Sequence, residues 1–170
     1  MKAITIWQPW ASLIVHGVKH YETRGWYTGY RGPIAIHAAD KKVTKKEWET
    51  FSEKLNMICG KQLPLHFRNG EIVYLNPKTK NETVLKRGCV LAVADIVDCI
   101  RIDKDFLARL TPLERALGDY SDGRCAWKLE NITTVFESDF SVSGQQRIWN
   151  LKYPFLTSSS VVIVPEHWEW

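Results

Sequence analysis

The segment that decides the fold covers residues 8–24 and reads QPWASLIVHGVKHYETR. A short strand is predicted directly before it, over residues 3–7, and Pro9 suits the first turn of a helix, where a missing N–H costs nothing. Apolar side chains then recur at helical spacing, and Gly17 is placed to end the helix in a left-handed turn. An extended stretch is predicted over residues 20–27. The segment therefore predicts a strand, a short helix and a second strand in close succession.

The rest of the chain is predicted to hold more strands than helices. Further strands are expected over residues 33–39, 89–102, 125–136, 145–151 and, as a last edge, 161–164. Thr44 and Glu47 form a capping box ahead of an apolar stripe, which predicts a second helix. Thr111 opens a short third helix that Gly118 closes. Because βαβ alternation is missing, we expect an α+β fold, a small mixed β-barrel with flanking helices, and not a parallel doubly wound sheet.

Residues 60–88 are the least regular part of this pattern. The Asn-Gly pair at residues 69–70 and the Asn-Pro pair at residues 76–77 punctuate two short β-like runs. We interpret the segment as a flexible hairpin-like insertion, which is either a solubilising loop or an arm that contacts phosphate. The lysines proposed to contact phosphate are Lys45 and Lys46 on the second helix and Lys78 and Lys80 in the insertion.

The composition is that of one ordered globular domain over residues 1–170. Hydrophobic residues make up 45% and charged residues 25% of the chain, whereas disordered chains combine low hydrophobicity with high net charge. No apolar run approaches the roughly 20 residues that span a bilayer, and the N-terminus lacks the pattern of a cleavable leader. We therefore expect a cytoplasmic protein with no membrane association, and we expect a monomer.

Charge and aromatic content favour a polyanionic partner, though weakly by themselves. The net charge is +4 and the isoelectric point is 8.9. The eight tryptophans can serve as core residues, as we expect for Trp127 and Trp149, or as stacking surfaces for bases. The four cysteines fall singly in the sequence, which predicts reduced thiols and neither a disulfide nor a zinc site.

Three charged residues at the end of the deciding segment form the candidate site. Glu22 and Arg24 point to the same face of a strand, and Lys19 lies in the incoming turn, from which it can reach that face. Arg makes bidentate contacts with phosphate, and Glu accepts hydrogen bonds from base amino groups. Trp10, at the start of the helix beside them, can stack on a base. A salt-bridged barrel mouth without any ligand is an equally good interpretation of the three charges.

The sequence indicates neither a metal nor a cofactor. The dinucleotide fingerprint GxGxxG and the GxxxxG motif are absent in any strand-to-helix context. Asp95 and Asp98 are an odd number of residues apart on a predicted strand, so they are expected to face opposite sides and not to hold a metal together.

The deciding segment, continued through YRGPIAIHAA, resembles the signature of the ASCH (activating signal cointegrator homology) family. The stretches GDYSDGRCAWKLENI and GQQRIWNL resemble the later motifs of the family, so the resemblance covers about residues 3–151. It implies a PUA-like β-barrel with a cleft beside the first helix. The family pattern implies that Lys19, Glu22 and Arg24 line this cleft. By their place in the pattern, four more residues are carried over as ligand-binding: Gln8, Trp10, Arg31 and His37.

The resemblance implies a binding module for RNA, another single-stranded nucleic acid or a nucleotide-like small molecule. The alternative is a hydrolytic enzyme on the same cleft, either a ribonuclease or an amidohydrolase of a modified nucleoside, with Lys19, Glu22 and Arg24 as its catalytic groups. Amidohydrolase-like members carry a nucleophilic threonine where this chain has Glu22, which argues against that mechanism here. His37 also fits a structural role at the exit of an apolar strand. A third interpretation is a protein-interaction adaptor that uses the C-terminal tail WEW at residues 168–170.

Overall fold

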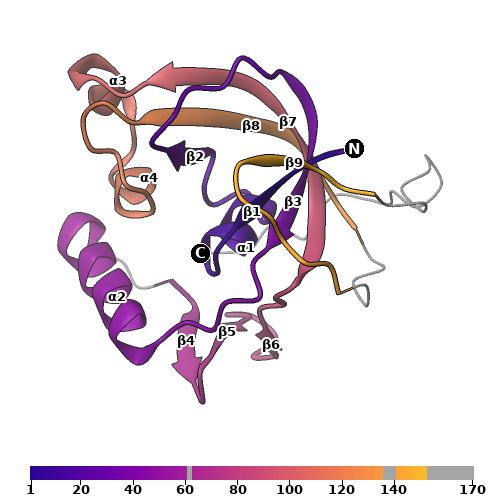
Figure 1. The fold of residues 1–170 in the computed structure, drawn as a ribbon. Coiled ribbons are helices and arrows are strands. Elements are labelled where there is room, and N and C mark those ends of the chain that lie inside the picture. The colour runs from indigo at the N-terminus through magenta and orange to yellow at the C-terminus, as the bar shows by residue number, and fades with distance from the viewer. Residues whose placement is uncertain (61–62, 136–140, 153–170) are drawn as a thin grey trace.

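The fold is built on a curled sheet of six strands. The computed structural model describes residues 1–60, 63–135 and 141–152. The strands of the sheet are β1 (Lys2–Ile6), β2 (Tyr21–Arg24), β3 (Gly32–Ala38), β7 (Cys89–Arg101), β8 (Cys125–Thr134) and β9 (Ile148–Asn150). Their order is β2-β8-β7-β3-β1-β9, with β1 and β3 parallel and the other pairs antiparallel. Register shifts in β3 and β7 mark bulges, which bend a sheet and so help it to curl into the half-barrel of Figure 1.

One helix fills the hollow of this sheet. α1 (Trp10–Val15) follows the cis peptide between Gln8 and Pro9, and Gly17, at φ 71, turns the chain away after it. The buried faces of α1, β1, β3, β7 and β8 form one core cluster that includes the fully buried Trp127. The strand–helix–strand succession predicted from the deciding segment is therefore confirmed, as is the placement of Trp127 in the core.

The other helices lie outside the sheet (Figure 1). They are α2 (Lys45–Cys59), α3 (Lys104–Arg109) and α4 (Pro112–Ala116). The capping box predicted for Thr44 and Glu47 is present at α2, and Thr111 caps α4 as predicted. α3, whose N-cap is Asp103, was not predicted from the sequence.

Residues 60–88 contain a second, three-stranded antiparallel sheet rather than the predicted two-stranded hairpin. Its strands are β4 (Leu65–Arg68), β5 (Glu71–Leu75) and β6 (Glu82–Val84), in the order β4-β5-β6. The predicted turn at Asn69 and Gly70 joins β4 to β5, and both residues have positive φ, as a tight hairpin turn requires. Apolar residues of this sheet pack with α2, α4 and the region of α1 in a second core cluster.

The mixed α+β class predicted from the sequence is confirmed, with two differences in its strands. The segment predicted at 145–151 pairs only over β9, because Arg147 adopts a left-handed backbone with φ 61 that interrupts extended structure. The strand predicted at 161–164 lies outside the described residues. Trp149 is buried in a third core cluster, as expected.

Candidate functional site

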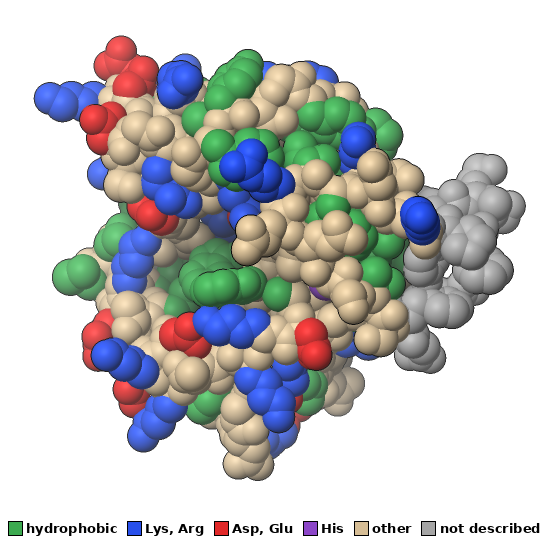
Figure 2. Space-filling model, in the orientation of Figure 1, with side chains coloured by type: hydrophobic (Ala, Val, Ile, Leu, Met, Phe, Trp, Pro, Cys, Tyr) green, Lys and Arg blue, Asp and Glu red, His purple; other side chains and the backbone are tan. Residues whose placement is uncertain are grey.

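A cleft of about 760 Å³ lies between α2 and the curled sheet. Most of its lining comes from four segments: residues 5–10 at the end of β1 and the start of α1, residues 22–24 of β2, one face of α2, and residues 116–119 at the end of α4 and directly after it. Figure 2 shows this hollow with hydrophobic side chains inside and Lys and Arg side chains around its edge. Five of the seven residues predicted to bind a ligand line it, namely Gln8, Trp10, Lys19, Glu22 and Arg24.

Aromatic rings form the apolar part of the cleft. Trp10 meets Phe51 of α2 edge-to-face, with ring centroids 5.7 Å apart, and Trp48 lies 5.6 Å from Phe51 at an interplanar angle of 37°. Trp7 borders the opening and is 52% exposed, with the Lys41 ammonium 3.7 Å from the centre of its ring. Of these four rings only Trp10 was selected from the sequence, because their meeting depends on tertiary packing, such as that of Phe51 on α2 against Trp10.

Glu22 and Arg24 form an ion pair in the wall made by β2. Arg24 Nε lies 2.8 Å from Glu22 Oε1, so the two side chains share one face of the strand, as alternation predicts. Arg24 Nη2 also donates to the carbonyl of Thr5 at 2.8 Å, which links β2 to the end of β1. Burial raises the pKa of Glu22, and this effect outweighs the nearby positive charges, of which Arg24 contributes most. A hydrogen-bond donor on a ligand would therefore stabilise the ionised form of Glu22.

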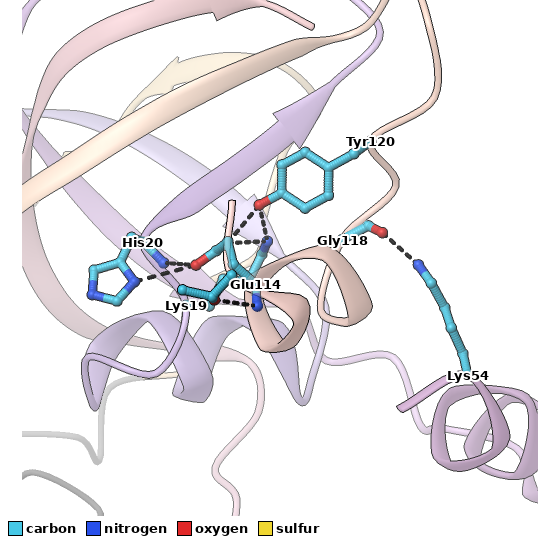
Figure 3. A network of polar contacts seen from close by, with 7 residues as sticks. Lys19, His20, Lys54, Glu114, Gly118 and Tyr120 are labelled. Carbon is cyan, nitrogen blue, oxygen red and sulfur yellow. Dashed lines mark hydrogen bonds and ion pairs between the residues drawn. The ribbon is translucent and has the colours of Figure 1, made fainter. Parts of the chain in front are cut away.

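Lys19 lies at the back of the cleft and is 1% exposed. Its ammonium donates to Glu114 Oε1 and to the hydroxyl oxygen of Tyr120, both at 3.3 Å (Figure 3). Burial lowers the pKa of Lys19, although the charges of Glu114 and Glu22 act in the opposite direction. The lysine is thus held in place by the protein before any ligand arrives.

Glu114 organises this back wall from α4, as Figure 3 shows. Its second oxygen, Oε2, accepts from the backbone N–H of His20 at 2.8 Å and lies 3.2 Å from the imidazole Nδ1. Tyr120 donates to Oε1 at 2.5 Å. Burial acts to raise the pKa of Glu114, but the hydrogen bond with His20, the charge of Lys19 and the Tyr120 hydroxyl together lower it to about 2. In the sequence Glu114 follows Thr111 at the place of an N3 acid, and its contacts with Lys19, His20 and Tyr120 depend on the tertiary packing.

Gln8 borders the cleft but serves the fold. Its Nε2 donates to Ser12 Oγ at 2.8 Å and to the carbonyl of Lys86 at 2.7 Å, and its Oε1 accepts from the backbone N–H of Ser12. Both amide donors of Gln8 are therefore occupied by the protein, and the side chain ties the start of α1 to the segment that returns from β6.

Arg31 and His37 do not line the cleft. Arg31 is exposed, donates to the carbonyls of Thr28 and Tyr30 and pairs with Asp98 at 3.1 Å. His37 is 1% exposed, and its Nε2 lies 2.8 Å from the carbonyl oxygen of Val142. The structure thus does not bring these two residues together with the other five.

The four lysines proposed to contact phosphate are also separated. Lys46 lines the cleft, whereas Lys45 pairs with Glu49 on the exposed side of α2. Lys78 and Lys80 lie in the turn between β5 and β6 and do not line the cleft. In addition, Lys41, Lys54 and Arg124 line it, and none of these was selected from the sequence.

The described residues contain neither a metal-ligand cluster nor a membrane-spanning helix. Across residues 1–60, 63–135 and 141–152, no group of three or more His, Cys, Asp or Glu side chains is arranged to hold a metal ion. Within the same residues, no helix is both long and apolar enough to cross a lipid bilayer.

A curled α+β half-barrel with a helix packed inside it and a cleft beside that helix defines a PUA-like domain. Comparison with known families gives the particular one: the model of the ASCH domain matches residues 4–140, and the chain belongs to this family. ASCH domains have a PUA-like fold that is generally associated with RNA binding.

Two curated relatives are similar to this chain. One is activating signal cointegrator 1 of Homo sapiens, 28% identical over 148 residues that cover 87% of this chain and 22% of that protein. The other is activating signal cointegrator 1 of Mus musculus, 27% identical with the same coverage. The chain spans about a fifth of the length of these relatives, so the likeness concerns the domain rather than those whole proteins.

Proposed function

We propose that this domain binds an unpaired segment of RNA and holds one nucleotide in the cleft. The observation that carries this proposal is an aromatic pocket with an excess of positive charge around it. Six cationic residues line the cleft, namely Lys19, Arg24, Lys41, Lys46, Lys54 and Arg124. Three acidic residues, Glu22, Glu47 and Asp119, oppose them. A surplus of lysine and arginine around aromatic rings suits a ligand that is both flat and anionic.

The two parts of a nucleotide match different parts of the cleft. Trp10 and Trp48 each pack against Phe51, and the three rings together offer an apolar surface to a base. Glu22 in the β2 wall can accept hydrogen bonds from a base amino group. Lys46 and Lys54 line the cleft from α2. Lys54 donates to the carbonyl of Gly118 (Figure 3), and both lysines add positive charge that can attract phosphate.

The contacts of Lys19, Glu22 and Arg24 favour binding over hydrolysis. Lys19 already meets Glu114 and Tyr120, and Glu22 is paired with Arg24, so each group is engaged by the protein rather than poised to move a proton. No observation favours the ribonuclease or the amidohydrolase alternative. Binding without turnover is therefore the proposed activity.

Neighbouring lysines of α2 provide a matched test of binding. Lys46→Glu reverses a charge that lines the cleft, and Lys45→Glu reverses an adjacent charge that does not. With a fluorescent single-stranded RNA, we expect Lys46→Glu to weaken binding by about tenfold, which corresponds to about 1.4 kcal/mol, while Lys45→Glu changes it much less. Equal losses in the two variants would point to general charge attraction, and no RNA binding by the wild type would overturn the proposal.

The same reagents decide between binding and catalysis. Labelled single-stranded RNA and DNA are incubated with the wild type and with the Lys19→Ala and Glu22→Gln variants, and the products are separated by size. We expect intact strands throughout, and we expect RNA to bind more tightly than DNA. Cleavage by the wild type that disappears in both variants would replace the proposal with the enzymatic alternative.

Other properties belong to the same proposal. We propose one domain over residues 1–170, supported by the core cluster that the insertion shares with α2 and α4. We also propose a monomer in the cytoplasm, where the unpaired state of the buried thiols of Cys89, Cys99 and Cys125 fits a reducing compartment. The tail at residues 168–170, on which the adaptor interpretation depends, lies outside the described residues.

A further inference from the structure

Two aromatic residues follow the cleft wall directly in the sequence. After Arg24, the chain continues through Gly25 into Trp26 and Tyr27. The Trp26 ring meets the buried Trp127 edge-on, with centroids 4.6 Å apart, and Trp127 Nε1 donates to the Trp26 carbonyl at 3.4 Å. Tyr27 is 50% exposed. One ring is thus fixed on the core while the next faces the solvent.

An arginine lies over each of these rings. The guanidinium carbon of Arg147 is 5.9 Å from the centre of the Trp26 ring, and that of Arg101 is 6.0 Å from the centre of the Tyr27 ring. The two arginines come from segments far apart in the sequence, directly before β9 and at the end of β7. The fold therefore assembles two arginine–aromatic pairs on consecutive residues.

Neither arginine has its charge neutralised within the part of the chain that the structure describes. No carboxylate of a described residue forms an ion pair with Arg101 or Arg147. Three other arginines differ in this respect, since Arg24 pairs with Glu22, Arg31 with Asp98 and Arg124 with Asp119. Guanidinium groups held over aromatic rings keep their donors available at their edges, which is the geometry that binds phosphate oxygens.

The backbone at Arg147 adds a second indication. Its φ of 61 is left-handed, a conformation that costs a residue with a Cβ about 1–2 kcal/mol. An exposed cation–π contact contributes only about 0.5–1 kcal/mol. The contact with Trp26 therefore does not by itself offset the strain, and strain of this kind concentrates at functional positions.

The two pairs adjoin the cleft. Consecutive Cα atoms are about 3.8 Å apart, so the backbone of Trp26 lies within about 8 Å of that of Arg24 in the cleft wall. Arg124, which also lines the cleft, has its Nη1 3.8 Å from the position that a Cβ on Gly25 would occupy. On the other side, Ile148 pairs with Ile4, which places Arg147 beside Thr5, another lining residue.

We infer that the Trp26–Arg147 and Tyr27–Arg101 pairs form a second subsite, which binds the phosphodiester backbone of the nucleotides next to the one in the cleft. This inference rests on the proposed function and deepens it: the ligand is a single strand of at least two nucleotides rather than a free mononucleotide. The two guanidinium groups bind phosphodiester oxygens, and the rings beneath hold those groups in place. The strand runs from the cleft past Arg124 and over Trp26 and Tyr27.

The test compares a strand with a mononucleotide in the same variants. The probes are a fluorescein-labelled RNA octanucleotide of mixed sequence, followed by anisotropy, and the four nucleoside 5′-monophosphates, followed by calorimetry. In the Arg101→Ala/Arg147→Ala double variant, we expect about tenfold weaker binding of the octanucleotide and unchanged binding of the monophosphates. The slope of log affinity against log salt should fall by about 0.7 for each arginine removed, the value for a phosphate contact on a single strand.

Two further variants make the result specific. Arg109 lies 6.0 Å from the centre of the Phe106 ring on α3 and does not line the cleft, so Arg109→Ala removes the same kind of pair elsewhere. Arg147→Gly removes the guanidinium at a position whose backbone suits glycine, so folding is preserved. We expect no loss of octanucleotide affinity in the first and several-fold loss in the second.

The outcomes separate this inference from the proposed function. The inference is overturned if the double variant binds the octanucleotide like the wild type, if Arg109→Ala loses as much, or if monophosphates bind as tightly as the octanucleotide. In the last case the proposed function stands, because the cleft still binds a nucleotide. If neither probe binds the wild type, the proposed function fails and the subsite fails with it.

Discussion

Lys19 and His37 are equally buried, yet they lie in surroundings of opposite kinds. Each is 1% exposed, and each was selected from the sequence as a ligand-binding residue. Lys19 ends in a network with Glu114 and Tyr120 that borders an open cleft. His37 lies against Trp149, with ring centroids 5.9 Å apart, outside the lining of that cleft.

Lys19 and His37 differ in their charged partners and not in how deeply they are buried. Burial lowers the pKa of His37, which favours the neutral imidazole, and its Nδ1 is buried without a hydrogen-bond partner among the described residues. Such a side chain behaves as part of the core. Lys19, by contrast, keeps a charged partner and has a second carboxylate, Glu22, nearby. A buried polar residue therefore indicates a ligand-binding site when charged residues around it also line a cleft.

The largest expected effect is the loss of the carboxylate that pairs with Lys19. Glu114→Ala leaves the ammonium of Lys19 buried without its partner, so we expect the free energy of unfolding to fall by about 3–5 kcal/mol. Urea unfolding followed by circular dichroism measures this. The exposed pair of Lys45 and Glu49 on α2, at 3.7 Å, provides the control, and Glu49→Ala should cost less than about 0.5 kcal/mol.

A double variant checks that the cost arises from the unpaired charge. Lys19→Met combined with Glu114→Ala removes the ammonium as well as the carboxylate, so part of the lost stability should return. Equal costs for Glu114→Ala and Glu49→Ala would contradict the view that the two pairs differ through burial.

Gly118 packs beside Lys19 and Gly144 beside His37, so substitutions at the two glycines compare the surroundings of these two residues. A Cβ on Gly118 would lie 2.5 Å from the Tyr120 ring and 3.0 Å from Lys19 Nζ, whereas one on Gly144 would lie 2.7 Å from both His37 Cε1 and Thr5 Oγ1. We expect either alanine to reduce the free energy of unfolding by about 1–3 kcal/mol, as overpacking does. RNA affinity should fall clearly in Gly118→Ala, which displaces Lys19, and much less in Gly144→Ala.

For each of the two variants, urea unfolding curves give the free energy of unfolding, and anisotropy titrations on the same preparation give the RNA affinity. A larger loss of RNA affinity in Gly144→Ala than in Gly118→Ala would place the functional end of the sheet at His37 and would reverse the comparison.

Local signals predicted most of the fold. The capping box at Thr44, the cap at Thr111 and the turn at Gly70 are each written in a few neighbouring residues, and each was confirmed. The strand predicted at 145–151 was shortened at Arg147, whose left-handed backbone no propensity for arginine indicates.

Only the part of the cleft that residues 8–24 form could be predicted from the sequence. Glu22 and Arg24 are two residues apart on a strand, so their common face follows from alternation. Glu114 is 95 residues from Lys19, and their meeting depends on the packing of α4 against the turn after α1. The α2 side of the cleft was missed for the same reason, since nothing local indicates which face of that helix meets Trp10 and lines the cleft.

The smallest expected effect concerns His20, which connects the buried network to solvent. Its side chain is 65% exposed, and the hydrogen bond with Glu114 raises the pKa of His20 despite some burial. A group with a raised pKa in the folded state stabilises the fold fully below its unfolded pKa, here 6.5, and loses that contribution as the pH rises through the folded pKa. Because the imidazole side of this pair is exposed to solvent, we expect less than about 1 kcal/mol.

Urea unfolding at a series of pH values between about 5 and about 9, on either side of the histidine pKa, measures this contribution in the wild type and in His20→Gln. The wild type should lose stability relative to the variant as the pH rises, because only the wild type loses a positive charge beside Glu114. His37, whose folded pKa is lowered, acts with the opposite sign and is present in both proteins, so the difference between the two curves isolates His20. Parallel curves would mean that the imidazole does not share the Glu114 carboxylate in solution, and that only the backbone N–H of His20 and the side chains of Lys19 and Tyr120 hold it.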